Sequence, residues 1–153
     1  MTPFFNTPDR IIALRAAAAS WLGTPFMGNA AVKGAGVSCQ TLVASIYIES
    51  GFLPPDFEIV KAPMDWSHAQ TESLVVKAVS SLPHFFKPIE GMSLATGDLV
   101  GFKIGGCVHH CGIVVDAGNR FIHCLRGHGT VYSEIRDATY LSRLENAWRP
   151  ITN

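Results

Sequence analysis

The stretch Val37-Ser38-Cys39-Gln40-Thr41-Leu42-Val43 decides the fold and places a thiol where a helix starts. Ser38 is a residue type that caps helix N-termini, and an apolar helical pattern follows it. Cys39 therefore falls in the first helical turn, where the positive end of the helix dipole favours a thiolate. The preceding segment, 28–36, is rich in Gly and Ala, so a substrate can approach its backbone closely. The pattern predicts a cysteine nucleophile.

Two β-rich runs further along the chain carry histidines. Val108–Val115 and Arg120–Leu125 are separated by Asp-Ala-Gly-Asn, which predicts a β-hairpin. Because side chains alternate along a strand, His109 and His110 lie on opposite faces. His123, on the second run, is then a cross-strand neighbour of His110. The chain thus supplies a nucleophile, a base and a base-orienting group in the order Cys, His, His.

Other short motifs accompany these residues in the same order as in a known family. They are Trp21-Leu22-Gly23-Thr24-Pro25-Phe26, Ser38-Cys39-Gln40, Gly97-Asp98-Leu99-Val100, His110-Cys111-Gly112-Ile113-Val114 and Phe121-Ile122-His123. Together they resemble the NlpC-type cell-wall cysteine peptidases of the NlpC and p-sixty superfamily. The resemblance covers most of the chain. It implies a papain-like α+β fold and cleavage of peptidoglycan stem peptides, with Cys39 as nucleophile, His110 as base and His123 as the third polar residue.

The chain departs from the family pattern around the nucleophile. Family members commonly have Asp before the cysteine and Ser after it, where this chain has Ser38 and Gln40. Loss of the carboxylate removes a charge-assisted partner for a substrate amine. Phe26 stands where the family usually has Tyr, so a hydroxyl contact is missing. We therefore expect Phe26, Ser38 and Gln40 to contact the substrate and to alter its specificity.

Two further functions use the same residues. The first is a catalytically degenerate domain of the same fold that binds a ligand without cleaving it. The second is a thiol acyltransferase or amidase with the same Cys-His-His triad. Labelling of Cys39 and analysis of the products distinguish them from a peptidase.

A dense set of possible metal ligands raises the alternative of a zinc site. The set contains Cys107, His109, His110, Cys111, His123, Cys124 and His128. Cys107, His109 and Cys111 follow one another at two-residue steps of a strand, whereas structural zinc sites usually take paired ligands from tight knuckles. We therefore predict no metal and no cofactor. His109, Cys111 and Cys124 are interpreted as packing residues, and His68, His84 and His128 as surface or loop residues.

Composition indicates one domain, residues 1–153, with a peptide substrate. The chain has 153 residues, of which 48% are hydrophobic, and 12 basic side chains balance 12 acidic ones. Neutral charge favours neither nucleic acid nor an anionic membrane, and no apolar run is long enough for a membrane span. No signal peptide pattern opens the chain, so we expect a protein that is cytoplasmic as synthesised, with reduced thiols. Action on a cell wall then requires release or an assembly such as a phage tail.

Periodicity predicts helices first and strands later, which is typical of the α+β class, with N-terminal helices on a C-terminal antiparallel sheet. A first helix runs from Thr7 to Gly23 with an apolar stripe, a second from Cys39 to Gly51, and a third from Trp66 to Val79. The stripe consists of Ile11, Ile12, Ala16, Ala19 and Leu22. Strands are expected at Asp98–Ile104, Val108–Val115, Arg120–Leu125, Thr130–Ile135 and Asn146–Arg149. Asp98 is interpreted as a structural turn residue, and the segment from Phe52 to Lys87 as a long insertion beside the cleft.

Overall fold

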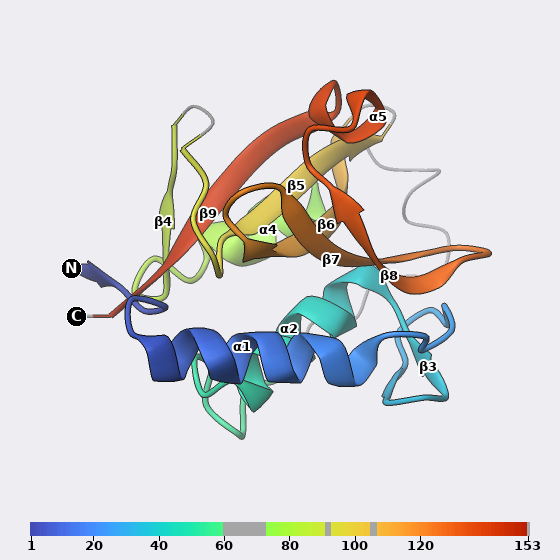
Figure 1. Ribbon diagram of the computed structural model, residues 1–153, viewed down its shortest axis with the longest axis horizontal. Coiled ribbons are helices and arrows are strands. Elements are labelled where there is room, and N and C mark those ends of the chain that lie inside the picture. Colours follow the sequence, from blue (N-terminus) through green and yellow to red (C-terminus); the bar gives the residue numbers. More distant parts are fainter. Residues whose placement is uncertain (60–72, 91–92, 105–106, 153) are drawn as a thin grey trace.

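A computed structural model describes residues 1–59, 73–90, 93–104 and 107–152, apart from the side chains of residues 107 and 108. Two helices, α1 (Pro8–Trp21) and α2 (Cys39–Glu49), lie together on one side of a curled antiparallel sheet (Figure 1). Two shorter helices are α4 (Leu74–Ser80) and α5 (Ala138–Leu141). This arrangement confirms the α+β class predicted from the order of helical and strand patterns.

The sheet has the strand order β1-β9-β5-β6-β7-β8, and β4 also pairs with β9. Its strands are β1 (Thr2–Pro3), β4 (Phe86–Pro88), β5 (Leu99–Ile104), β6 (Cys107–Asp116), β7 (Arg120–Leu125), β8 (Gly129–Glu134) and β9 (Leu144–Thr152). A separate small sheet pairs β2 (Ala31–Val32) with β3 (Gly36–Val37). The five predicted strands are therefore present with modest shifts in their ends, whereas β1 to β4 and helix α5 were not predicted.

Helix α2 buries the stripe that its sequence predicts. Leu42, Ile46 and Tyr47 are fully buried, because their spacing brings them to one face of the helix. The Tyr47 hydroxyl donates to the carbonyl oxygen of Gly97 at 2.8 Å, so the buried phenol is satisfied. These contacts hold α2, and with it Cys39, against the sheet.

The predicted stripe of helix α1 is wrong. Ile12 and Leu22 are 64% and 40% exposed, whereas the helix buries Leu14, Trp21 and two alanines between them. The helix is rich in alanine and has a weak amphipathic pattern, so more than one face satisfies the apolar spacing. The bulky side chains of Leu14 and Trp21 decide which face is buried, because they remove the most apolar area from water.

Only the C-terminal part of the third predicted helix falls within the described residues, where it is helix α4. Helix α4 begins after Ser73, whose hydroxyl accepts the N–H of Val76 at 3.0 Å. The remainder of the prediction, including Trp66 and His68, lies in 60–72, outside the described residues. The long segment from Phe52 to Lys87 thus contains α4 and the start of β4 rather than loop alone. Among the described helices, none has the length and apolar character required to cross a bilayer.

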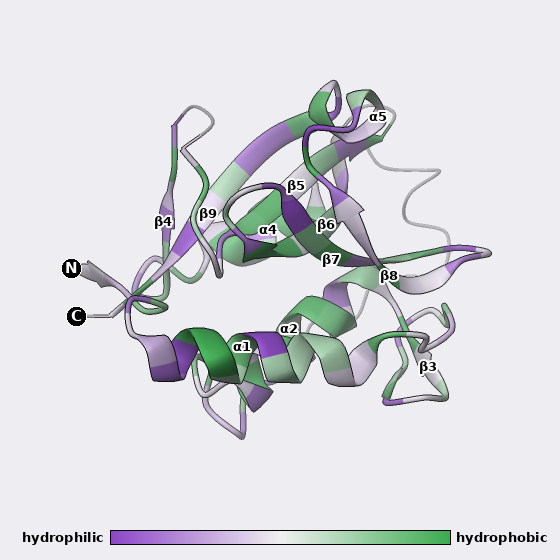
Figure 2. Cartoon of the chain, viewed as in Figure 1, coloured by the Kyte–Doolittle hydropathy of each residue, from purple (hydrophilic) through white to green (hydrophobic). Residues whose placement is uncertain are grey.

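The sheet separates two hydrophobic clusters. The larger cluster packs α1, α2 and α4 against one face of the sheet, and it includes Cys111 and Cys124. The smaller cluster lies on the opposite face and consists of Val100, Phe102, Val114, Phe121, Ile135 and Ala147. In Figure 2 the hydrophobic colour appears on α4, on the neighbouring strands of the sheet and on parts of α1 and α2. Successive side chains of the β6–β7 hairpin therefore point alternately into the two clusters, as predicted.

Asp98 has a structural role, as predicted, although its main partner was not. Its side chain is 1% exposed and accepts from the backbone N–H of Ala95 at 2.7 Å. The Arg149 guanidinium donates to both carboxylate oxygens, at 3.0 and 2.9 Å. Burial raises the pKa of Asp98, and the bonds from Arg149 oppose that shift. This ion pair ties the start of β5 to β9.

Candidate active site

Cys39 is the first residue of helix α2, directly after the N-terminal cap Ser38. As a residue it is half-buried. Its Sγ lies 3.8 Å from the carbonyl oxygen of His109 on β6. The first N–H groups of a helix have no partner within the helix, and they make this position electropositive. The structure therefore places the thiol as the sequence predicts.

Thr41 fixes the N-terminus of this helix. Its Oγ1 accepts the backbone N–H of Ser38 at 2.9 Å and donates to the carbonyl oxygen of Ala30 at 2.5 Å. Thr41 is 1% exposed, so water does not compete for these bonds. The helix start is thereby attached to the loop in front of it.

Close backbone contacts hold the residues that precede Cys39. Val37 N–H donates to the carbonyl oxygen of Pro25 at 3.0 Å, and Met27 N–H donates to that of Val37 at 2.9 Å. A side chain at Gly36 is excluded, because its Cβ would lie 2.7 Å from the Cβ of Met27. Phe26 forms a parallel bridge with Val37 and is thus kept beside the helix start.

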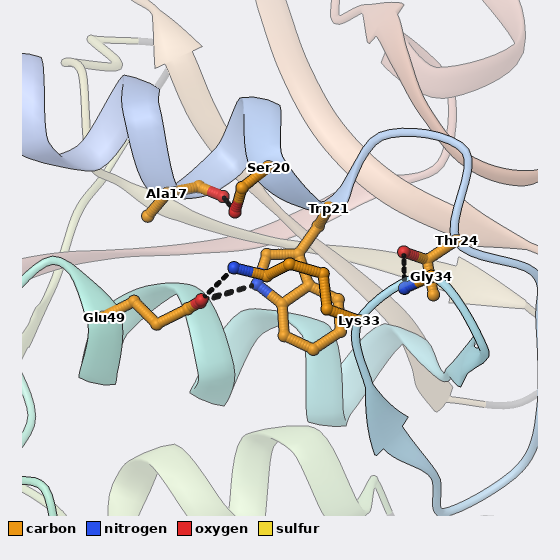
Figure 3. A network of polar contacts seen from close by, with 7 residues as sticks. All are labelled: Ala17, Ser20, Trp21, Thr24, Lys33, Gly34 and Glu49. Atoms are coloured by element: carbon orange, nitrogen blue, oxygen red, sulfur yellow. Dashed lines mark hydrogen bonds and ion pairs between the residues drawn. The ribbon is translucent and has the colours of Figure 1, made fainter.

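Side chains around helix α1 hold the same loop from the other side (Figure 3). The Glu49 carboxylate accepts from Trp21 Nε1 at 2.8 Å and lies 2.6 Å from Lys33 Nζ. The backbone N–H of Gly34 donates to Thr24 Oγ1 at 3.0 Å. The loop is therefore bound to both α1 and α2, which fixes the entry into the helix that carries Cys39.

His110 and His123 meet on the hairpin face that carries Val114 and Phe121, beside Tyr140 of α5. His110 Nε2 lies 2.8 Å from His123 Nδ1. In the antiparallel β6–β7 register Ile113 pairs with Ile122. Gly112 therefore lies opposite His123, and His110 is the diagonal neighbour of His123. The two imidazoles are 8% and 0% exposed. The structure thus brings together the two histidines that the sequence predicts as a pair.

Gly112 permits this close approach of the two strands. A Cβ on it would lie 2.6 Å from the carbonyl oxygen of Ile122 and 3.3 Å from the Cβ of His123. Real side chains do not tolerate the first distance, so only glycine fits without movement of the backbone. The glycine two residues after His110 is therefore part of the geometry that joins His110 to His123.

Aromatic rings enclose the histidine pair. The ring centres of Phe121 and Tyr140 lie 4.4 and 5.2 Å from that of His123, and Phe102 lies 5.9 Å from His110. Burial lowers the pKa of His123 to about 3, and the nearby charge of His110 adds to the shift. His123 is therefore a neutral imidazole at physiological pH.

Ser133 on β8 is the further partner of His123. His123 Nε2 lies 2.7 Å from Ser133 Oγ. In the β7–β8 register Phe121 pairs with Ser133, which makes Ser133 a diagonal neighbour of His123. Both ring nitrogens of the buried His123 are therefore occupied, one by His110 and one by Ser133.

The surroundings of Cys39 favour its thiolate. The pKa of Cys39 is lowered well below its ordinary value, and the largest cause is a hydrogen bond from the Cys111 thiol. A hydrogen bond to His110 and the charge of His110 lower the pKa further, whereas burial raises it. The same contact raises the pKa of Cys111, which stays protonated and donates. Because His123 occupies His110 Nε2, the nitrogen that remains for Cys39 is Nδ1.

The three residues predicted to contact substrate border Cys39 from different sides. Ser38 precedes it and Gln40 follows it, both half-buried. Phe26 is half-buried beside β3, and the Arg126 guanidinium lies 5.0 Å from the centre of its ring. Gln40 points to a different environment, since it lines an apolar cavity of about 270 Å³ between α2, α4 and the sheet. None of Cys39, His110 and His123 is among the described residues that line this cavity.

The residues weighed as zinc ligands are divided between environments. Cys111 and Cys124 are buried in the larger cluster, His109 is buried, and His84 and His128 are exposed, as the packing and surface interpretations require. The side chain of Cys107 lies outside the described residues. Across the described ranges, no three His, Cys, Asp or Glu side chains are grouped to hold a metal ion.

Three residues that shape this site were not predicted from the sequence. They are Thr41, Cys111 as a partner of Cys39, and Ser133. Thr41 had a local signal, because a polar residue three positions after a serine cap is typical of a capping box. The other two depend on strand register and on the docking of α2, for which no local pattern exists.

The comparison with known proteins rests on structure alone. No family model matches the sequence, and no curated protein matches it. An NLP/P60 family protein from Staphylococcus aureus, described as similar to a lipoprotein, superposes with a TM-score of 0.66 at 20% identity, over 100% of this chain and 45% of that one. The chain has an NlpC/P60-type fold.

Other NlpC/P60-type structures agree with this result. The NlpC/p60 domain of the peptidoglycan hydrolase SagA superposes with a TM-score of 0.58 at 17% identity, over 90% of this chain and 96% of that domain. NlpC2 from Trichomonas vaginalis gives a TM-score of 0.64 at 18% identity, over 95% of this chain and 47% of that one. This chain thus spans less than half of the proteins from Staphylococcus and Trichomonas, but nearly all of the SagA domain. At these identities the likeness establishes the NlpC/P60-type fold.

Proposed function

We propose that the protein is a cysteine peptidase that cleaves peptide or amide bonds of peptidoglycan stem peptides. The observation that carries the proposal is the half-buried Cys39 at the start of α2 with His110 acting on it and His123 behind His110. A nucleophile, a base and a group that orients the base are the parts that covalent acyl transfer needs. The fold shared with the domain of the peptidoglycan hydrolase SagA supports the choice of substrate.

The reaction proceeds through a thioester. The Cys39 thiolate attacks the carbonyl carbon while His110 holds the proton that the thiol has lost. The backbone N–H of Cys39 belongs to the first helical turn and stabilises the oxyanion. His110 then gives its proton to the leaving amine, and the acyl group remains on Cys39. Water, with His110 as the base that takes its proton, hydrolyses the thioester and restores the thiol.

Substrate preference follows from the residues beside the nucleophile. Ser38 places a hydroxyl where a carboxylate would attract an amine, so recognition of a free substrate amine is weakened. The Arg126 guanidinium over Phe26 provides a positive charge next to the loop that precedes Cys39. We therefore expect stem peptides that present a carboxylate to this side of the site to be better substrates than stem peptides that present an amine there.

The first test is the pH dependence of iodoacetamide labelling at each cysteine, read by peptide mass spectrometry. Cys39 should label below neutral pH, faster than Cys111 and Cys124, because only thiolates react. The His110→Ala variant should lose this selectivity. His84→Ala is the matched control, because His84 is exposed and is not among the groups that shift the pKa of Cys39. Equal labelling of all cysteines would favour the degenerate ligand-binding domain.

The second test is digestion of purified peptidoglycan followed by analysis of the released fragments. The wild type should release new amine and carboxylate ends, and Cys39→Ala should release none. Transfer of the acyl group to an added amine in place of water would identify an acyltransferase. Near-wild-type release by Cys39→Ala would refute the proposed nucleophile.

A further inference from the structure

The buried histidine pair has four ring nitrogens, and the hydrogen bonds decide which of them carry protons. His123 is 0% exposed, so water does not supply a donor or an acceptor to its ring. A neutral imidazole donates from one nitrogen and accepts at the other. His123 is neutral, because burial lowers its pKa to about 3. Its two contacts, to His110 and to Ser133, therefore have opposite polarity.

Only one of the two arrangements allows His110 to act as a base toward Cys39. His110 receives the thiol proton at Nδ1, so that nitrogen must carry a lone pair and Nε2 must carry the hydrogen. Nε2–H then donates to His123 Nδ1 at 2.8 Å. His123 carries its own hydrogen on Nε2 and donates it to Ser133 Oγ at 2.7 Å.

The opposite arrangement removes the base. If His123 carried its hydrogen on Nδ1, that hydrogen would point at His110 Nε2. A neutral His110 would then hold its hydrogen on Nδ1 and have no lone pair toward Cys39. A charged His110 is also disfavoured in this arrangement, because its Nε2–H would point at the Nδ1–H of His123. A serine hydroxyl can accept or donate, so the arrangement that keeps His110 a base is the one in which Ser133 Oγ accepts from His123 Nε2.

We propose that Ser133 is a positioning residue that fixes the tautomer of His123, and through it the orientation and basicity of His110. The proposal rests on the function proposed above. Ser133 is half-buried, so its own hydroxyl hydrogen can be given to solvent while its oxygen accepts from His123. Phe121 and Tyr140 meet His123 through ring contacts, and Ser133 Oγ is the hydrogen-bond partner of His123 Nε2.

The tautomer is measured directly by ¹⁵N NMR of the imidazole rings. In the wild type His123 should be protonated on Nε2 and His110 should carry a hydrogen on Nε2. Ser133→Ala should shift His123 toward the Nδ1–H form, and Ser133→Thr should restore the Nε2–H form, because threonine keeps the hydroxyl. An unchanged tautomer in Ser133→Ala would overturn the proposal.

Thr130→Val is the matched structural control. Thr130 lies on the same strand, β8, and its buried hydroxyl donates to the carbonyl oxygen of Thr24 at 3.0 Å. This variant also loses a buried hydrogen bond, but the bond does not involve a histidine. It should therefore leave the tautomer of His123 unchanged. If Thr130→Val shifted the tautomer as much as Ser133→Ala does, the effect would be a general loosening of β8 and the proposal would fail.

The consequence for Cys39 is measured by its labelling with iodoacetamide at acidic pH. The labelling rate should fall about three- to tenfold in Ser133→Ala, as expected for the loss of one hydrogen bond, and recover in Ser133→Thr. If wild-type Cys39 showed no acidic labelling at all, the proposed peptidase would fail while the NMR result would still decide the role of Ser133. If Ser133→Ala shifted the tautomer of His123 but left the labelling rate of Cys39 unchanged, the tautomer of His123 would not influence His110. That result would also overturn the proposal.

Discussion

His110 Nε2 and His123 Nδ1 lie 2.8 Å apart, although the two residues are diagonal rather than directly opposite in the β6–β7 hairpin. Side chains of this length bridge a diagonal pair on one face of a sheet. The position directly opposite His123 belongs to Gly112, which adds no side chain between the two rings. The contact joins the candidate base to a neutral, fully buried imidazole, and the predictions below follow from that environment.

Stability should depend on pH through His123. Its pKa falls from 6.5 to about 3 on folding, so between these values the unfolded chain binds the additional proton. The free energy of unfolding should therefore decrease as the pH is lowered through this window, by up to about 1.4 kcal/mol per pH unit. Above pH 6.5 the contribution of His123 should be constant.

The comparison of wild type with His123→Asn isolates this contribution. Denaturant unfolding at a series of pH values gives the slope for each protein, and the other titrating groups are common to both. The slope should be smaller in His123→Asn. Equal slopes would mean that His123 takes up its proton in the folded protein as readily as in the unfolded one.

Removal of the Cys111 thiol should raise the pKa of Cys39. The hydrogen bond from Cys111 is the largest of the causes that lower this pKa, so Cys111→Ala should move the labelling curve of Cys39 to higher pH. The labelling rate of Cys39 below neutral pH should fall several-fold, which corresponds to the free energy of about one hydrogen bond. His110 remains in place, so peptide cleavage should persist at higher pH.

Cys124→Ala is the matched control for this variant. Cys124 is as buried as Cys111, at 2% exposure, but its thiol donates to the carbonyl oxygen of Val37 at 3.4 Å. Its removal should leave the labelling curve of Cys39 in place. A similar displacement in both variants would indicate a general response to loss of packing, and none in Cys111→Ala would contradict the assigned hydrogen bond.

A side chain at position 112 should separate β6 from β7. The Cβ of Gly112→Ala would lie 2.6 Å from the carbonyl oxygen of Ile122, and backbone atoms must move to relieve that contact. We expect a loss of about 1–3 kcal/mol in the free energy of unfolding, which is typical of overpacking in a core. Denaturant unfolding measures it, and NMR of the imidazoles should report a weakened contact between His110 and His123.

Gly118→Ala provides the control in the same hairpin. Its Cβ would meet only the side chain of Asp116, at 3.3 Å, in the exposed turn. A flexible carboxylate can move away, so this variant should unfold near the wild-type denaturant concentration. Equal destabilisation of the two variants would contradict the close approach at Gly112.

Local patterns in the sequence were sufficient for most of the elements. The serine cap and apolar spacing predicted α2 from Cys39, and alternation placed His109 and His110 on opposite faces. Each of these features depends on residues within a few positions of one another, where helix and strand periods act directly. The buried face of α1 was not predicted correctly, because an alanine-rich helix has several faces of similar hydrophobicity and only its neighbours select one.

Contacts between distant segments were decided by the tertiary structure. The sequence by itself determined a thiol at a helix start and two histidines on neighbouring strands. It did not determine that Ser133 reaches His123, that Cys111 meets Cys39, or that Arg149 pairs with Asp98. Those contacts depend on strand register and on how α2 docks on the sheet, which the packing of the whole core selects and no short pattern encodes.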